Sequence, residues 1–103
     1  MQVEFTKIAK LTLKKNVDFL KILWTDKEVA EFLDDVDNLT RTLKEGKFLM
    51  FQEYSKNIRS ALIGRKHVRV YFKLQNKNLI KILLYFHTKE DPKKLREYLK
   101  NNR

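Results

Sequence analysis

Hydrophobic and polar positions near the N-terminus predict a strand followed by a helix. Over residues 2–5, polar and apolar side chains alternate as they do in a short β-strand. Thr6 can then cap a helix, because its hydroxyl can accept an amide hydrogen of the first turn. The apolar stripe of this helix consists of Ala9, Leu13, Val17, Leu20 and Trp24, widened by Ile8, Leu11, Phe19 and Leu23. This helix is expected to bury one face against another layer.

A second helix is marked at both of its ends. Residues 25–28 read Thr-Asp-Lys-Glu, a capping box in which the threonine hydroxyl and the glutamate carboxylate each accept a backbone amide hydrogen. Apolar residues then recur with helical period as far as Leu43, and Gly46 stands where a left-handed C-terminal cap belongs. Because the turn at residues 24–26 is short, the two helices should lie antiparallel.

Three strands and a last helix follow. The strands are predicted at residues 57–63, 67–74 and 79–86, separated by polar segments of hairpin length at 64–66 and 76–78. In the middle strand, an apolar face of Val68, Val70, Phe72 and Leu74 alternates with Arg69, Tyr71 and Lys73, which form a basic outward face. In the last strand, Ile80, Ile82, Leu84 and Phe86 are expected to continue the apolar face. Asp91 and Pro92 open a helix that runs to about residue 101.

The predicted order of elements is β-α-α-β-β-β-α, which indicates an α+β fold. An N-terminal helical hairpin should pack on a small antiparallel β-sheet, with a short C-terminal helix at the end of the chain. At this length, residues 1–103 are expected to form a single domain.

Charge is unevenly distributed along the chain, whose formal net charge is +10. Residues 1–25 carry +3, residues 26–45 carry −4 and residues 46–103 carry +11. The C-terminal half should therefore attract nucleic acid or an acidic protein. The alternative is that the lysines serve only solubility.

Several kinds of chemistry are excluded or disfavoured by composition. The absence of cysteine excludes disulfides, thiolate zinc sites and cysteine nucleophiles. His67 and His87 are twenty residues apart with no carboxylate at metal-ligand spacing, and Gly46 and Gly64 are isolated, so neither a metal nor a cofactor is expected. No run of apolar residues is long enough to span a bilayer, and an acid interrupts the N-terminal segment where a signal peptide is apolar. A cytoplasmic protein without a membrane partner is expected.

The candidate functional residues form a basic set on or beside the strands. They are Arg59, Arg65, Lys66, Arg69, Lys73 and Lys89, with Tyr71, His67 and His87 interleaved. Such a surface could hold phosphate groups, and a histidine within it could act as a general acid or base near neutral pH. The alternative reading makes Arg69 and Lys73 solvated positions of an amphipathic strand, and His87 a hydrogen-bonded residue at the rim.

Taken in order, these features resemble the RelE/ParE superfamily of bacterial toxins. The resemblance is carried by the helical hairpin with its turn at Trp24, the Ile58-Arg59 strand entry and the segment from Arg65 to Leu95. Lys89-Glu90-Asp91-Pro92 stands where many members have Arg-Gln-Asp-Pro. The family is the toxic half of type II toxin–antitoxin pairs, so the resemblance implies a cognate antitoxin and an oligomeric complex with it.

The resemblance implies two mechanisms. RelE-like members cut mRNA on the ribosome without a metal, and this reading gives catalytic roles to Arg69, His87 and Lys89. ParE-like members inhibit DNA gyrase by binding. In either case Arg59, Arg65, Lys66 and Lys73 are expected to contact the target or the antitoxin.

Two departures favour the ParE-like reading. Leu95 occupies the region where nuclease members have a C-terminal tyrosine, and Ser60, Ala61 and Leu62 replace the lysine-rich strand of RelE. The long helical hairpin and the Asp-Pro ending also look more like the ParE branch. We therefore expect a ParE-like growth inhibitor. The alternatives are a RelE-like ribosome-dependent mRNA endonuclease and a non-toxic basic domain that only binds a protein.

Overall fold

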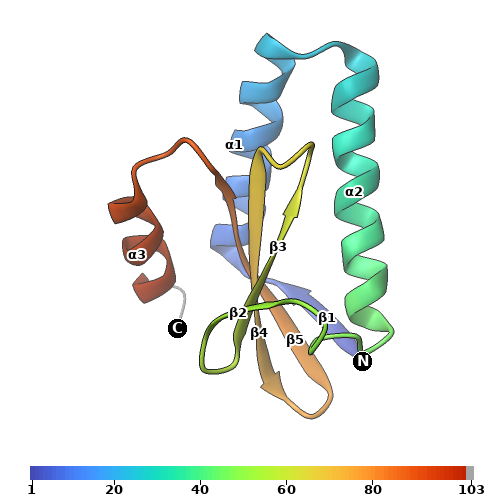
Figure 1. The fold of residues 1–103 in the computed structure, drawn as a ribbon, viewed down its shortest axis with the longest axis vertical. Coiled ribbons are helices and arrows are strands. Elements are labelled where there is room, and N and C mark those ends of the chain that lie inside the picture. The colour runs from blue at the N-terminus through green and yellow to red at the C-terminus, as the bar shows by residue number, and fades with distance from the viewer. Residues whose placement is uncertain (102–103) are drawn as a thin grey trace.

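The computed structural model describes residues 1–101 and contains every predicted element and one more (Figure 1). The elements are β1 (Gln2–Phe5), α1 (Lys7–Leu23), α2 (Asp26–Lys44), β2 (Gln52–Ser55), β3 (Ile58–Ile63), β4 (Val68–Asn76), β5 (Leu79–His87) and α3 (Pro92–Asn101). The prediction of three strands after the helical hairpin was wrong, because β2 was missed. All four residues of β2 are exposed, so no apolar alternation marks it in the sequence.

The five strands form one sheet in the order β1-β5-β4-β3-β2. β1 runs parallel to β5, and the other neighbours are antiparallel. The helix pair α1 and α2 lies on one side of the sheet and α3 on the other (Figure 1). This arrangement confirms the predicted α+β fold.

Helix ends follow the local chemistry that the sequence indicates. The Thr6 hydroxyl accepts the amide hydrogen of Ala9, and Thr25 and Glu28 form both halves of a capping box. Gly46 has a φ of +83°, the left-handed conformation that ends α2. These short-range interactions fix the start of α1 and both ends of α2.

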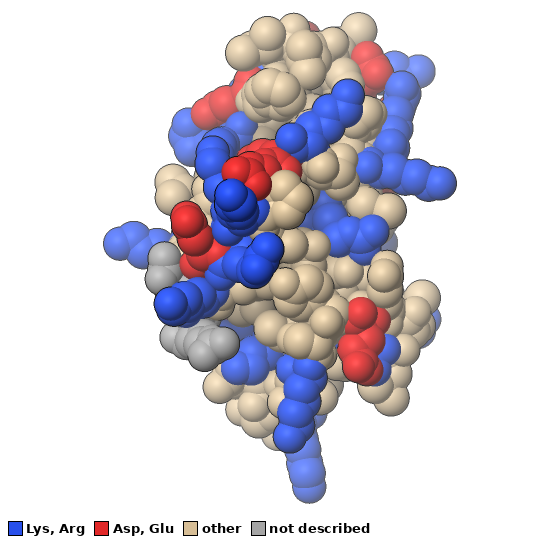
Figure 2. Space-filling model, turned by 60° about the vertical axis from the view of Figure 1, so that its left-hand side comes forward, with Lys and Arg blue, Asp and Glu red and all other residues tan. Residues whose placement is uncertain are grey.

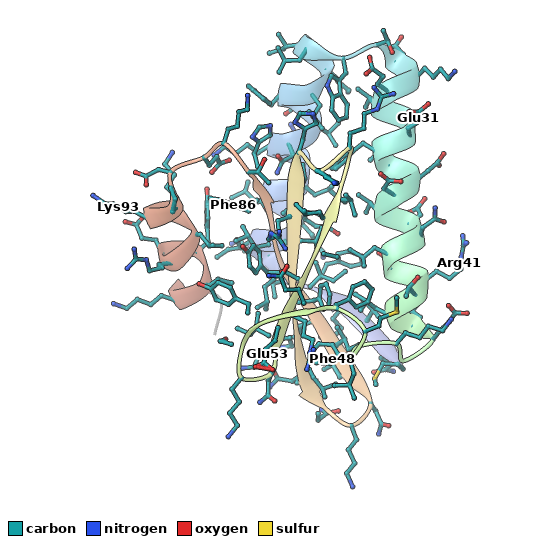
Figure 3. The ribbon with its side chains drawn as sticks, viewed as in Figure 1. Glu31, Arg41, Phe48, Glu53, Phe86 and Lys93 are labelled. Carbon is teal, nitrogen blue, oxygen red and sulfur yellow. The ribbon has the colours of Figure 1, made fainter. Side chains whose placement is uncertain are left out.

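Two hydrophobic clusters lie on opposite faces of the sheet. The larger is between the sheet and the helix pair, and its fully buried large side chains include Phe32, Phe72, Ile80 and Ile82. The smaller cluster lies beneath α3 and consists of Tyr71, Leu83, Leu84 and Phe86, against which Ile8, Ile58, Leu95, Tyr98 and Leu99 pack. Figure 3 shows Phe86, from this cluster, between α3 and the sheet.

A β-bulge in β5 overturns one prediction. Tyr71 pairs with Leu84 but Phe72 pairs with Ile82, so Leu83 is an extra residue in β5. An extra residue reverses the alternation beyond it. Leu84 and Phe86 therefore face α3 and do not continue the apolar face of Ile80 and Ile82. Tyr85 joins the larger cluster in their place.

Beyond the bulge, α1 takes the place of a strand beside β5. The pairing of β1 with β5 ends at Ile82. The Thr12 hydroxyl then accepts the amide hydrogen of Tyr85 at 3.0 Å, and Asn16 Nδ2 donates to the Tyr85 carbonyl at 2.9 Å. Both polar side chains are buried, so this edge of the sheet keeps its hydrogen bonds without a strand partner.

The contact of Thr12 and Asn16 with β5 also explains why the predicted apolar stripe of α1 is only partly buried. Ala9 and Leu20 are buried, whereas Leu11, Phe19 and Leu23 remain exposed. The expectation that these three residues widen the buried face was wrong, because the ridge of Thr12 and Asn16 lies against β5. Within residues 1–101, no helix is long and apolar enough to cross a membrane.

Candidate functional site

The face of β4 that points away from α1 and α2 carries three of the predicted residues. Val68, Val70, Phe72 and Leu74 pack in the larger cluster, so Arg69, Tyr71 and Lys73 point to the α3 side. This alternation was predicted. The face is less open than expected, however, because Tyr71 is buried beneath α3 and stacks edge-on against Tyr54, with ring centres 5.2 Å apart. Its burial raises the pKa of the Tyr71 hydroxyl.

Arg69 is positioned by side chains of β3 and β2. Its Nη1 donates to the Ser60 hydroxyl at 3.0 Å and to Gln52 Oε1 at 3.2 Å. Both acceptors are neutral, so they orient the guanidinium without cancelling its charge. Arg69 therefore remains able to receive an anionic group on the α3 side of the sheet.

His87 lies on the other side of the sheet. It pairs with Val68, whose side chain is in the larger cluster, whereas Arg69 pairs with Phe86 beneath α3. The His87 ring contacts Phe19 of α1 edge-on at 5.2 Å and stacks against His67 at 6.2 Å, measured between ring centres.

The surroundings of His87 favour its neutral form. Burial lowers its pKa from the ordinary value, and the neighbouring His67 lowers it further. Its Nδ1 accepts the backbone amide hydrogen of Lys89 at 3.2 Å. The ring also lines a cavity of about 300 Å³ together with Phe19 and Glu90. Because Nδ1 accepts the hydrogen bond from Lys89, the hydrogen of the neutral ring is on Nε2.

The three residues with predicted catalytic roles do not meet on one surface. Arg69 points to the α3 side, and His87 points to the helix-pair side. Lys89 is exposed in the turn between β5 and α3, where its backbone, not its ammonium group, contacts His87. Their catalytic roles stay predictions.

Arg59 is engaged within the protein. Its Nη1 donates to the carbonyl oxygens of Phe51 at 2.8 Å and Leu49 at 3.3 Å, and its guanidinium lies 5.5 Å from the centre of the Phe48 ring. These contacts hold the segment between α2 and β2 against the sheet. Its role in binding stays a prediction.

Arg65 and Lys66 form the tip of the β3–β4 hairpin, as the sequence predicts. Both have positive φ angles, 56° and 70°. Arg65 pairs with Glu28 at 2.9 Å and Glu31 at 3.2 Å, so its charge is used to fasten the hairpin to α2. The Lys66 side chain is exposed.

A groove on the α3 side brings together residues that the sequence analysis did not connect. Its volume is about 680 Å³, and it is lined by Tyr54, Ser55, Lys56, Ile58, Lys73, Leu83, Arg96, Leu99 and Lys100. Of its four cations, only Lys73 was predicted to bind a partner. Arg96 and Lys100 stand one helical turn apart on α3, and this spacing could have identified them as one basic face.

Within residues 1–101, no group of three or more His, Cys, Asp or Glu residues could hold a metal ion. Neither a protein-family model nor a curated protein sequence matches the chain.

Proposed function

We propose that this chain is a growth-inhibiting toxin that acts by binding an essential target and is neutralised by a cognate antitoxin, in the manner of ParE-like proteins. DNA gyrase is the first target to test. The proposal draws on the resemblance to the RelE/ParE superfamily. The single observation that carries the choice of mechanism is the placement of Arg69 and His87 on opposite sides of the sheet.

Opposite placement matters because cleavage of a phosphodiester requires its catalytic groups to act on one phosphate. A general base must lie within hydrogen-bond reach of the proton that it removes, about 3 Å. Here a sheet separates the guanidinium of Arg69 from the imidazole of His87. A binding surface has no such requirement, since each cation can meet a different acidic group.

A RelE-like mRNA endonuclease is the second candidate. The observation that favours it is the cavity of about 300 Å³ that the His87 ring lines beside Phe19 and Glu90, where a histidine could act as a general acid or base. In this alternative His87 would act on the helix-pair side of the sheet, without Arg69.

The test is to induce this chain alone in bacteria and to follow DNA synthesis and translation by pulse labelling. The binding proposal predicts that DNA synthesis stops first, that mRNA stays intact and that His87→Gln still inhibits growth. If translation stops first, with mRNA cut at in-frame codons and with inhibition lost in His87→Gln, the endonuclease replaces the proposal.

A second assay addresses the target. Purified protein should reduce supercoiling by DNA gyrase, and unaffected supercoiling at saturating protein would remove gyrase as the target. If induction leaves growth unchanged, the chain is a non-toxic domain that only binds a protein.

A further inference from the structure

We propose that the cavity between α1 and the turn from β5 to α3 binds a free amino acid with an aromatic or branched apolar side chain. Its volume is about 300 Å³, at the lower end of the range for small-molecule sites, and it is lined by Lys15, Asn16, Phe19, His87, Glu90 and Lys94. The inference goes beyond the proposed function, because the ligand is a small molecule and its binding does not depend on growth inhibition.

Two residues of this cavity carry hydrogen-bond acceptors that have no donor. The Glu90 side chain is 20% exposed, and its Oε2 is buried without a hydrogen-bond partner. Lys15 Nζ lies 3.6 Å from Oε1, which is an ion-pair distance but too long for a hydrogen bond. Asn16 Nδ2 donates to the carbonyl oxygens of Thr12 and Tyr85, and across residues 1–101 no group donates to Asn16 Oδ1.

An ammonium group on a ligand would satisfy these acceptors. A largely buried carboxylate without donors has lost the hydrogen bonds that it makes in water, so a ligand that restores them gains binding free energy. Rotation about the last bond of the Glu90 side chain interchanges its two oxygens, so either of them can turn toward the cavity. Because Glu90 and Asn16 line one small cavity, the three hydrogens of an ammonium can reach both, and its charge pairs with the carboxylate.

The charges around the cavity disfavour a ligand that is only cationic. Lys15 and Lys94 also line it, and within the part of the chain that the structure describes no acid lies within ion-pair distance of Lys94. Figure 2, which brings the α3 side forward, shows Lys and Arg side chains spread over much of this face, with acidic side chains among them. A carboxylate on the same ligand would balance its ammonium and pair with the ammonium group of Lys94.

Two aromatic rings give the cavity an apolar corner. The rings of Phe19 and His87 meet edge-on at 79°, with their centres 5.2 Å apart. His87 is buried, whereas Phe19 is 46% exposed although its side chain is large and apolar. An apolar side chain placed against this corner would remove the Phe19 ring from water, which favours binding. An α-amino acid with an apolar side chain combines this group with the ammonium and the carboxylate in one small molecule.

The experiment titrates the purified full-length chain with L-phenylalanine and follows the backbone amide signals by NMR. The amides of Lys89 and Glu90 report on the cavity, because they donate to Nδ1 and to the carbonyl oxygen of His87. Their shifts should saturate with a Kd of about 1 mM. Three analogues each lack one group: L-phenylalaninamide the carboxylate, N-acetyl-L-phenylalanine the ammonium and L-alanine the ring. Each should bind at least about fivefold more weakly.

Two pairs of variants test the charged groups. Glu90→Gln should weaken binding of L-phenylalanine about fivefold, and its control Glu97→Gln, which changes an exposed residue of α3 outside the cavity, less than about twofold. Lys94→Ala should weaken binding about threefold, with Lys93→Ala as its control. Figure 3 shows Lys93 on the side of α3 away from the sheet. The amide spectrum of each variant verifies that it is folded.

Several results would overturn the inference. The absence of a saturable shift up to about 10 mM L-phenylalanine would mean that the cavity does not take an amino acid. Equal binding of an analogue would mean that the group it lacks is not recognised and, for the two blocked forms, that a peptide end can replace the free amino acid. Equal weakening by the control variants would reduce the effect to overall charge.

A nucleotide separates this inference from the endonuclease, the second candidate function, which would use the same cavity. Guanosine monophosphate should bind more weakly than L-phenylalanine. Tighter binding of the nucleotide, weakened by Lys94→Ala and not by Lys93→Ala, would assign the cavity to RNA and overturn the inference. Because purified protein is used, none of these results depends on whether the chain inhibits growth.

Discussion

The two faces of the sheet differ in how their polar and charged groups are partnered. On the helix-pair side, Asn16 and Thr12 pair with the backbone of Tyr85, and the hairpin tip is fastened by Arg65 to α2. On the α3 side, the hydrophobic cluster is smaller and four cations surround a groove without a carboxylate. We expect the first face, with its larger cluster, to carry most of the stability of the fold, and the second to retain charge that a partner can use.

The largest difference in the free energy of unfolding should come from replacing one large side chain on each face by alanine. Phe32 is fully buried in the larger cluster, so Phe32→Ala should lower the free energy of unfolding by about 3–5 kcal/mol. Leu95 of α3 is only partly buried against the smaller cluster, and Leu95→Ala should cost about 1 kcal/mol. Chemical denaturation measures both values. Equal losses would contradict the assignment of stability to the helix-pair face.

Alanine substitutions at the two glycines should lower the free energy of unfolding by smaller and unequal amounts. A Cβ at Gly64, where φ is +59°, would lie 2.8 Å from Cδ1 of Phe32, whereas a Cβ at Gly46, where φ is +83°, meets nothing within 4 Å. Gly64→Ala should therefore cost about 2–4 kcal/mol, and Gly46→Ala, which has only the backbone strain, about 1 kcal/mol. Thermal or chemical unfolding should separate the two variants, and a larger loss in Gly46→Ala would show that the hairpin tip can move away from α2.

Removing the buried side-chain amide of Asn16 in α1 should lower the free energy of unfolding by somewhat less than Gly64→Ala does. Asn16→Ala leaves the Tyr85 carbonyl oxygen without its side-chain donor and should cost about 1–3 kcal/mol. Asn38→Ala is the control, because Asn38 is exposed and should change stability by no more than about 0.5 kcal/mol. The same unfolding measurement applies. If both variants were equally stable, α1 would not be replacing a strand beside β5.

The smallest predicted effect is a pH dependence from His87. Its pKa in the folded protein is below the ordinary value of 6.5, so the unfolded chain binds the proton more readily. Stability should therefore fall as pH decreases through about 6.5, and the loss should stop once the folded state is also protonated. His87→Gln should flatten the unfolding free energy between about pH 7.5 and pH 5.5. An unchanged slope would show that His87 is protonated equally in both states.

Features set by neighbouring residues could be predicted from the sequence. Thr25 and Glu28 form their capping box within four residues, Gly46 ends α2, and the alternation along β4 places Arg69 and Lys73 on one face. In each case the cause and the consequence lie within a few residues of each other.

Features that depend on distant contacts could not be predicted. The bulge at Leu83 is invisible in an apolar run, because both faces of β5 are buried. The buried roles of Thr12 and Asn16 depend on Tyr85, which is far along the chain. The groove joins cations from the β2–β3 turn, β4 and α3, and only the folded sheet brings them together.

The most direct test of the functional account compares growth inhibition by two variants that each lose positive charge. Arg41 lies on α2 and points outward in Figure 3, whereas Lys73 and Arg96 line the groove on the α3 side. We expect Arg41→Ala to inhibit growth as the unaltered chain does, and Lys73→Ala combined with Arg96→Ala to inhibit it much less. Equal inhibition by the two variants would show that Lys73 and Arg96 do not bind the target, and inhibition lost only in His87→Gln would contradict a toxin that acts by binding.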